Sequence, residues 1–156
     1  MLINDTLGKD AEKKISEWLN RPNDGYCFDR IKDQMTGRKG STNICDFTLF
    51  KAPYFYYIES KATWDDRFSF SMLTPKQHDG LLEKSMITNV YGVVIVLFAT
   101  YKRAFIIDIN EIKRLEDKGK KSLNIKNIDK WDIKYKEIET VPSRQDLLSY
   151  SGEFIL

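Results

Sequence analysis

The sequence predicts an α/β fold, a mixed central β-sheet flanked by helices, with the core order helix, three strands, helix, strand. Three observations indicate this fold. Near the N-terminus, Leu7, Ala11 and Ile15 recur at helical spacing. Residues 54–61 are rich in aromatic side chains, which favour strands. Residues 91–99 are almost wholly apolar, as a strand covered on both faces should be.

Boundary signals place the elements along the chain. Asp5 is expected to cap the first helix, and Pro22 follows its end. Thr74 before Pro75 is a strong start for the second long helix, which should run to about residue 87. The strands are predicted at 26–31, 44–50, 54–61, 91–99, 104–109 and 131–138, and a short helix at 110–118.

The composition is typical of one globular, cytoplasmic domain spanning residues 1–156. Apolar residues make up 42% of the chain and charged residues 31%. The longest apolar run, from Val93 to Ala99, is far shorter than the ~20 residues that span a bilayer. Cys27, Cys45 and one histidine are too few for structural zinc, so both cysteines are expected to be free, buried thiols.

Charge is distributed unevenly along the chain. The formal net charge is only +2, which by itself does not identify a nucleic-acid binder. Arg30 to Lys39 nevertheless holds four bases and one acid, and Lys118 to Lys136 holds seven lysines and two acids. Each run is either an ordinary solvated face or a surface that contacts phosphates, and the sequence leaves both interpretations open.

Three charged residues are expected to converge on one side of the sheet. Glu59 and Lys61 are two residues apart in a predicted strand, so their side chains point to the same face. A short turn at Pro53 brings the preceding strand alongside, and Asp46 with it. Charged groups in such an apolar sheet are costly unless they are paired or bind a metal ion.

Two interpretations fit this cluster. A Glu59–Lys61 ion pair at a sheet edge explains two of the residues but gives Asp46 no role. Two carboxylates with a lysine suit a hard, oxygen-liganded cation such as Mg²⁺, for which Mn²⁺ can substitute. Such an ion stabilises charge on a phosphate, and Lys61 would orient the attacking water or stabilise the transition state.

The ordered set of motifs resembles a known nuclease superfamily. Asp46 followed by Glu59-Ser60-Lys61 is similar to the D…ExK signature of the restriction-endonuclease-like, PD-(D/E)xK superfamily, whose core has the same αβββαβ order. A closer resemblance, from Gly8 to Ile109, is to the RecU-type Holliday junction resolvases and their phage-encoded relatives. It rests on Ser41-Thr42, Tyr57 to Thr63, Arg67 to Leu73, Gln77 and Tyr91 to Val94.

The resemblance implies roles for individual residues. Asp46, Glu59 and the main-chain carbonyl of Ser60 would bind the metal ion, Lys61 would be the catalytic lysine, and Gln77 would help to order the site. Glu12 would complete the metal site through water, although a surface glutamate is an equally good interpretation. DNA contacts are expected from the basic runs and from the threonine after the lysine, at Arg38, Lys39, Thr63, Lys118, Lys120 and Lys121.

The sequence departs from the resolvase pattern in two places. Tyr57-Ile58 precede Glu59 where the resolvases often carry Asp-Phe. Residues 32–42 leave room only for a short basic loop, whereas longer bacterial resolvases have a projecting stalk that enters the junction. The second departure bears on specificity for four-way junctions and leaves the nuclease chemistry untouched.

The expected function is that of a metal-dependent endonuclease that cuts branched DNA as a symmetric homodimer, without membrane association. Trp18, Leu19 and Phe68 to Phe70 are the candidate dimer contacts and are equally good core residues. His78 is expected at the surface and not as a base. The alternatives are a less selective phage or repair endonuclease of the same superfamily, a catalytically inactive DNA-binding module of recombination, and a structural protein.

Overall fold

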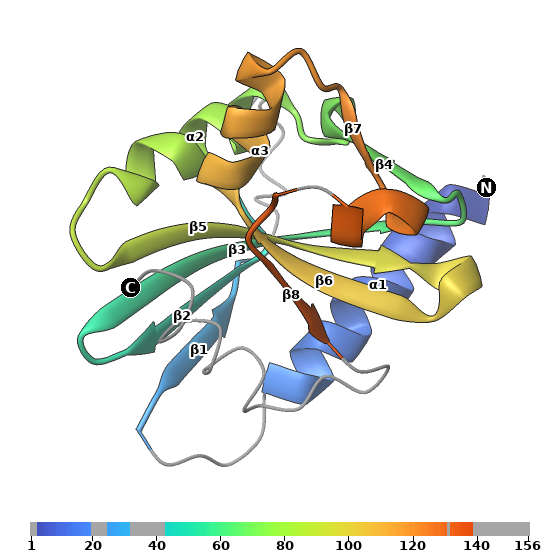
Figure 1. Ribbon diagram of the computed structural model, residues 1–156. Helices are drawn as coiled ribbons and strands as arrows, with labels where there is room; N and C mark the ends of the chain where they lie inside the picture. Colours follow the sequence, from blue (N-terminus) through green and yellow to red (C-terminus); the bar gives the residue numbers. More distant parts are fainter. Residues whose placement is uncertain (1–2, 20–24, 32–42, 131, 139–156) are drawn as a thin grey trace.

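Six strands form one mixed sheet at the centre of the molecule (Figure 1). The computed structural model describes residues 3–19, 25–31, 43–130 and 132–138. The strands of this sheet, in spatial order, are β1 (Cys27–Arg30), β2 (Phe47–Lys51), β3 (Tyr54–Thr63), β5 (Val90–Phe98), β6 (Arg103–Asp108) and β8 (Tyr135–Ile138). Only β3 and β5 pair in parallel, and the other neighbours are antiparallel. The predicted mixed sheet is confirmed, and β3 lies inside it with a partner on each side.

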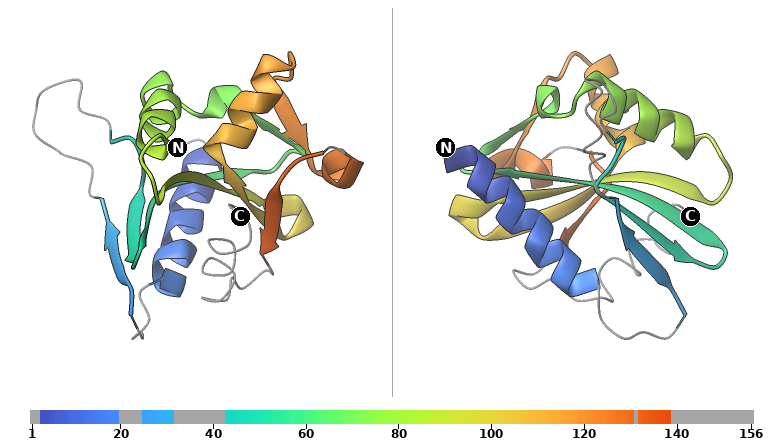
Figure 2. Two further views of the ribbon diagram at one scale, coloured as in Figure 1. Left: turned by 60° about the vertical axis from the view of Figure 1, so that its left-hand side comes forward. Right: turned by 180° about the vertical axis from the view of Figure 1, so that it is seen from behind.

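Helices cover both faces of the sheet (Figure 1, Figure 2). α1 (Ile3–Leu19) packs on one face, while α2 (Pro75–Ser85) and α3 (Ile109–Asp117) pack on the other. Alternate residues of β5 therefore enter different cores. The core beneath α1 contains Ile15, Phe47, Tyr56, Ile58, Val93 and Ile95, and the core beneath α2 and α3 contains Leu81, Val94, Val96, Phe105, Ile112 and Leu115.

α2 begins where the sequence predicts. The Thr74 hydroxyl accepts from the Gln77 backbone, the Gln77 side chain accepts from the Thr74 backbone, and Pro75 opens the helix. Two glycines let α2 approach its neighbours closely. A Cβ at Gly92 would lie 2.7 Å from the Leu81 carbonyl oxygen, and one at Gly80 would lie 2.5 Å from Cγ2 of Ile44.

A second, two-stranded sheet lies outside the sequence prediction. It pairs β4 (Arg67–Ser69) with β7 (Ser122–Asn124), and the short helices η1 (Phe70–Met72), η2 (Ala99–Tyr101) and η3 (Ile125–Lys130) complete the connections. Phe68 and Phe70 are 0% and 5% exposed. These two aromatics belong to the core, which is one of the two interpretations that the sequence left open.

Several sequence expectations need correction. Asp5 lies within α1, which begins at Ile3, and therefore is not its cap. β2 begins only at Phe47, so Asp46 lies just before the strand. Cys27 and Cys45 are both free, but Cys27 is exposed. The basic loop at 32–42, with Arg38 and Lys39, and the side chains of Trp18 and Leu19 lie outside the described residues.

The helices of the described residues are too short or too polar for a membrane span.

Candidate active site

An ion pair occupies the middle of β3. Nζ of Lys61 lies 2.7 Å from Oε1 of Glu59. The Glu59 side chain is 2% exposed and that of Lys61 is 18% exposed. β3 pairs with β2 only as far as Ile58, so Glu59 and Lys61 have a strand partner, β5, on one side only, yet both side chains are largely buried. A buried pair of this kind is weak evidence for stability, because removing both charges from water is costly.

Asp46 reaches the same strand from the segment that precedes β2. Its backbone N–H donates to the Ile58 carbonyl at 3.0 Å, and its own carbonyl accepts from the Ile31 N–H at 2.8 Å. Oδ2 of its side chain accepts two hydrogen bonds from Ser60, from the backbone N–H at 2.8 Å and from the hydroxyl at 2.7 Å. The structure thus brings Asp46, Glu59, Ser60 and Lys61 together.

The electrostatic environment of Glu59 is unfavourable to its charge. Burial, and then the negative charge of Asp46, raise the pKa of Glu59 to about 8, although Lys61 opposes this shift. Oε2 of Glu59 is buried and has no hydrogen-bond partner within the described residues. Burial is also the main reason why the pKa of the neighbouring Cys45 thiol is raised to about 12. The site therefore concentrates negative charge without fully compensating it.

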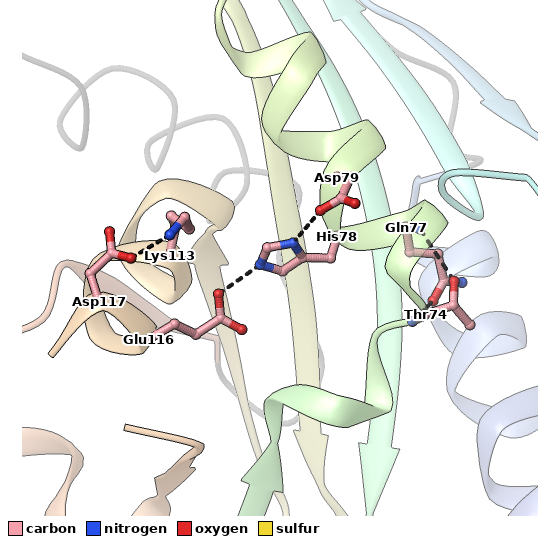
Figure 3. A network of polar contacts seen from close by, with 7 residues as sticks. All are labelled: Thr74, Gln77, His78, Asp79, Lys113, Glu116 and Asp117. Carbon is pink, nitrogen blue, oxygen red and sulfur yellow. Dashed lines mark hydrogen bonds and ion pairs between the residues drawn. The ribbon is translucent and has the colours of Figure 1, made fainter. Parts of the chain in front are cut away.

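Gln77 links α2 to the Glu59 carboxylate. Its Oε1 accepts from the Thr74 N–H at 3.0 Å, while its Nε2 donates to Oε1 of Glu59 at 2.7 Å. The first bond fixes which end of the amide faces Glu59, because only the Nε2 end can donate. Figure 3 shows Gln77 and Thr74 together at the start of α2. From the residues alone, Gln77 in the first turn of the helix could either help to bind an anion or hydrogen-bond the backbone.

Comparison with known proteins identifies the family. Residues 32–149 match the family model of RecU, described as recombination protein U. This match covers well over half of the chain. The chain belongs to the RecU family of Holliday junction resolvases.

A solved structure has a similar fold. It is Hjc of Archaeoglobus fulgidus, described as a Holliday junction resolvase from an archaeal hyperthermophile. The TM-score is 0.55 with 14% sequence identity, over 86% of this chain and 97% of that one. At this identity the likeness concerns the fold, which is the restriction-endonuclease-like fold that the sequence predicts. A comparison with curated proteins finds no match.

RecU membership makes this chain an endonuclease of branched DNA that acts in recombination. The RecU match includes the segments that carry Asp46, Glu59, Lys61 and Gln77. Glu12, in α1, lies outside the matched range. In the structure its Oε2 pairs with the Arg30 guanidinium at 2.6 Å. Its negative charge also makes a small contribution to raising the pKa of Glu59.

The other expected site residues lie in different surroundings. Thr63 is 8% exposed, and its hydroxyl accepts from the Asp65 N–H at 3.1 Å in the turn that ends β3. Lys118, Lys120 and Lys121 are exposed after α3, and the Lys121 carbonyl accepts from the Phe70 N–H. The first basic run, with Arg38 and Lys39, falls almost entirely within the residues that the structure does not describe.

His78 is partly buried between α2 and α3. Its ring nitrogens lie 2.9 Å from Oδ1 of Asp79 and 2.8 Å from Oε2 of Glu116 (Figure 3). The side chain is only 18% exposed, so it is less accessible than the sequence suggests. It connects α2 with α3, and the two hydrogen bonds of its ring go to Asp79 and Glu116 rather than to Asp46 or Glu59.

Proposed function

We propose that this chain cleaves four-way DNA junctions with Mg²⁺, and that Asp46, Glu59 and Lys61 form the catalytic centre. The observation that carries the proposal is the unsatisfied, buried Oε2 of Glu59 beside a second carboxylate. A buried carboxylate oxygen without a donor is costly unless a cation compensates it. We expect the substrate DNA to lie in the cytoplasm.

The donor set fits a hard divalent cation. Within the described residues, no three His, Cys, Asp or Glu side chains gather closely enough to hold a metal ion between them. Mg²⁺ does not require three, because it retains several waters and binds proteins through one or two carboxylates. Asp46 and Glu59 would be these two ligands, with the Ser60 carbonyl as a third and Glu12 acting through water. Mn²⁺ would substitute because it accepts the same oxygen ligands.

The residues of the chain divide the work of hydrolysis. A bound divalent cation supplies charge neutralisation at the scissile phosphate and acidifies water. Ser60 orients the Asp46 carboxylate through two hydrogen bonds, and Gln77 with Lys61 holds Oε1 of Glu59. Lys61 would orient the attacking water and stabilise the charged transition state. The water loses a proton to the solvent as its oxygen attacks phosphorus, the bond to the 3′-oxygen breaks, and that oxygen takes a proton from the solvent. The products are a 5′-phosphate and a 3′-hydroxyl.

Phosphate contacts outside the centre would come from the basic runs. Lys118, Lys120 and Lys121 are exposed side by side in sequence, and Arg38 and Lys39 lie in the predicted basic loop. Thr63 is a candidate DNA contact only because it follows Lys61 in the sequence. Its hydroxyl already accepts a hydrogen bond in the turn that ends β3. A homodimer would present two such centres to the two opposed strands of a junction, because closed two-fold pairs suit a two-fold substrate.

Cleavage by point variants tests the centre. Asp46→Asn, Glu59→Gln and Lys61→Ala should each lower the rate on a four-way junction by about 100-fold or more, because groups that act as a unit fail together. Glu83→Gln removes an exposed acid from α2 and is the matched control, expected to cut normally. A wild-type cleavage rate for Asp46→Asn would contradict the proposal that Asp46 belongs to the catalytic centre.

Substrate comparison tests the specificity. Wild-type protein with Mg²⁺ should cut a four-way junction faster than a flap, a linear duplex or a single strand of matched sequence. Equal rates on all four would indicate the less selective endonuclease. Binding without cleavage, with Mg²⁺ and also with Mn²⁺, would indicate the inactive recombination module.

A further inference from the structure

An exposed tryptophan follows directly on the strand that carries Glu59 and Lys61. Trp64 comes three residues after Lys61, about 10 Å along an extended chain. It is 48% exposed, whereas tryptophan is usually largely buried. One DNA strand advances about 3.4 Å per nucleotide, so a phosphate at Lys61 would lie within about three nucleotides of the indole.

A second exposed aromatic lies at the same end of the sheet. Phe98, opposite Thr63 in the parallel β3–β5 pair, leads into η2, where Tyr101 is 36% exposed. The Thr100 hydroxyl donates to the Trp64 carbonyl at 2.6 Å and so ties η2 to the end of β3. We call Trp64 and Tyr101 the aromatic pair.

The backbone beneath Trp64 is fixed on both sides. The Thr63 hydroxyl accepts from the Asp65 N–H at 3.1 Å, and the Asp66 carbonyl accepts from the Ile125 N–H at 2.9 Å. Asp66 also pairs with Lys126, with 3.0 Å between Oδ2 and Nζ. An aromatic side chain on a fixed backbone has little conformational freedom to lose on binding, which favours its use as a contact.

The charges around the aromatic pair favour a polyanion. The hydrogen bond to Asp66, and then the charge of Tyr101, raise the pKa of Lys126 and so favour its positive charge. Lys102 and Arg67 are also exposed there. The acids are Asp65 and Asp66, and Lys126 neutralises Asp66. Three bases thus face two acids, of which one is paired.

We propose that Trp64 stacks on a nucleobase exposed at a DNA branch point, with Lys102 and Lys126 beside the adjoining phosphates. The inference rests on the proposed function, since it takes the scissile phosphate to lie at Asp46 and Glu59. Bases within a linear duplex are covered by their neighbours, whereas an unpaired or unstacked base presents a free face. Stacking on an aromatic side chain needs no particular base sequence. Trp64 therefore distinguishes branched from linear DNA without reading sequence.

Binding to matched DNAs tests this role. Trp64→Ala in the full chain, with Ca²⁺ in place of Mg²⁺, should weaken binding to a four-way junction about ten-fold, within the range for loss of one stacked base. Binding to a linear duplex of the same length should change less than two-fold. Trp64→Phe should retain most junction affinity. Phe50→Ala removes another exposed aromatic, 43% exposed, at the far end of β2 and is the control, expected to bind as wild type.

A fluorescent base gives a second readout. With 2-aminopurine at the branch point, wild-type protein should quench its emission more strongly than Trp64→Ala at saturating protein. Wild-type junction affinity in Trp64→Ala, or equal losses on junction and duplex, would overturn the stacking role while leaving cleavage by Asp46 and Glu59 intact. A wild-type protein that neither binds nor cuts any of these DNAs would overturn the proposed function itself.

Discussion

Nε2 of Gln77 donates a hydrogen bond of 2.7 Å to Oε1 of Glu59, joining the first turn of α2 to the middle of β3. The same amide completes the capping box of α2 through Thr74. One side chain therefore serves both the start of a helix and the orientation of a buried carboxylate.

Gln77→Ala should lower junction cleavage by roughly ten-fold, because the hydrogen bond that orients the Glu59 carboxyl group is lost. Thr74→Ala is the matched control. It removes the cap hydroxyl and should lower the free energy of unfolding by about 1 kcal/mol. The Thr74 backbone N–H still orients Gln77 in this variant, so its cleavage rate should hold. Equal losses of activity in both variants would mean that Gln77 acts only through helix stability.

Gly80→Ala should displace either α2 or the segment that leads to Asp46. The new Cβ would lie 2.5 Å from Cγ2 of Ile44, a branched group close to the backbone. We expect the free energy of unfolding to fall by about 1–3 kcal/mol and cleavage to fall with it. Gly8→Ala, in α1 with nothing within 4 Å, should instead stabilise by about 0.5–1 kcal/mol. Ile44→Ala should partly rescue Gly80→Ala, and additive losses in the double variant would argue against this contact.

The His78 bridge should make stability depend on pH. Burial lowers the pKa of His78, but the hydrogen bonds to Asp79 and Glu116 outweigh it, so the pKa is raised above 6.5 in the fold. The bridge therefore stabilises fully below pH 6.5 and is lost as pH rises through the higher, folded pKa. Chemical unfolding of His78→Gln should show a deficit of about 1 kcal/mol near pH 5 that shrinks toward pH 8. A deficit that is constant over this range would assign His78 to packing alone.

The basic loop should contribute to the salt dependence of DNA binding. The slope of log K against log salt is negative, and each lost phosphate contact reduces its magnitude by about 0.9. Arg38→Ala with Lys39→Ala should therefore reduce the magnitude by about 2. The triple alanine variant of Lys118, Lys120 and Lys121 is the comparison and should have the smaller effect per residue. An unchanged slope in the loop variant would mean that the loop is a solvated face.

The homodimer should be visible by light scattering. We expect a mass of about twice 18.3 kDa at micromolar protein, with or without junction DNA. Phe68→Ala should reduce the amount of folded protein through the core rather than dissociate the pair, because that side chain is buried. A monomer under both conditions would indicate an enzyme that cuts one strand at a time. It would exclude paired cuts of opposed strands by a single dimer.

Local signals in the sequence predict the main elements. Thr74 and Pro75 predict the start of α2 because capping depends on neighbours within four residues. Asp5 misleads because acidic residues favour both the cap and the first turn of a helix, and α1 begins at Ile3. The pairing of β4 with β7 leaves no sequence signal, since three-residue strands are too short for periodicity and Phe68 meets Leu123 only in the fold.

One part of the candidate site also follows from local signals in the sequence, and the other part depends on the tertiary fold. Alternation along β3 places Glu59 and Lys61 on one face, and a short turn brings Asp46 near them, so the cluster follows from the sequence. The Ser60 contacts with Asp46 follow only from the register of β2 and β3. The Glu59 contact with Gln77 depends on how α2 packs across the sheet. Nothing in the residues alone predicts a tertiary contact of this kind, and only the family resemblance indicated that Gln77 helps to order the site.

The two carboxylates differ in how firmly the fold holds their backbones. Glu59 lies within β3, where it pairs with Val94 of β5, whereas Asp46 lies one residue before β2, in a segment joined to its neighbours through Ile31 and Ile58. Amide protons near Glu59 should therefore exchange with solvent only when the whole protein unfolds, while those near Asp46 should also exchange through local opening. One ligand of the centre is thus part of the rigid scaffold, and the other can adjust its position while the rest of the protein stays folded.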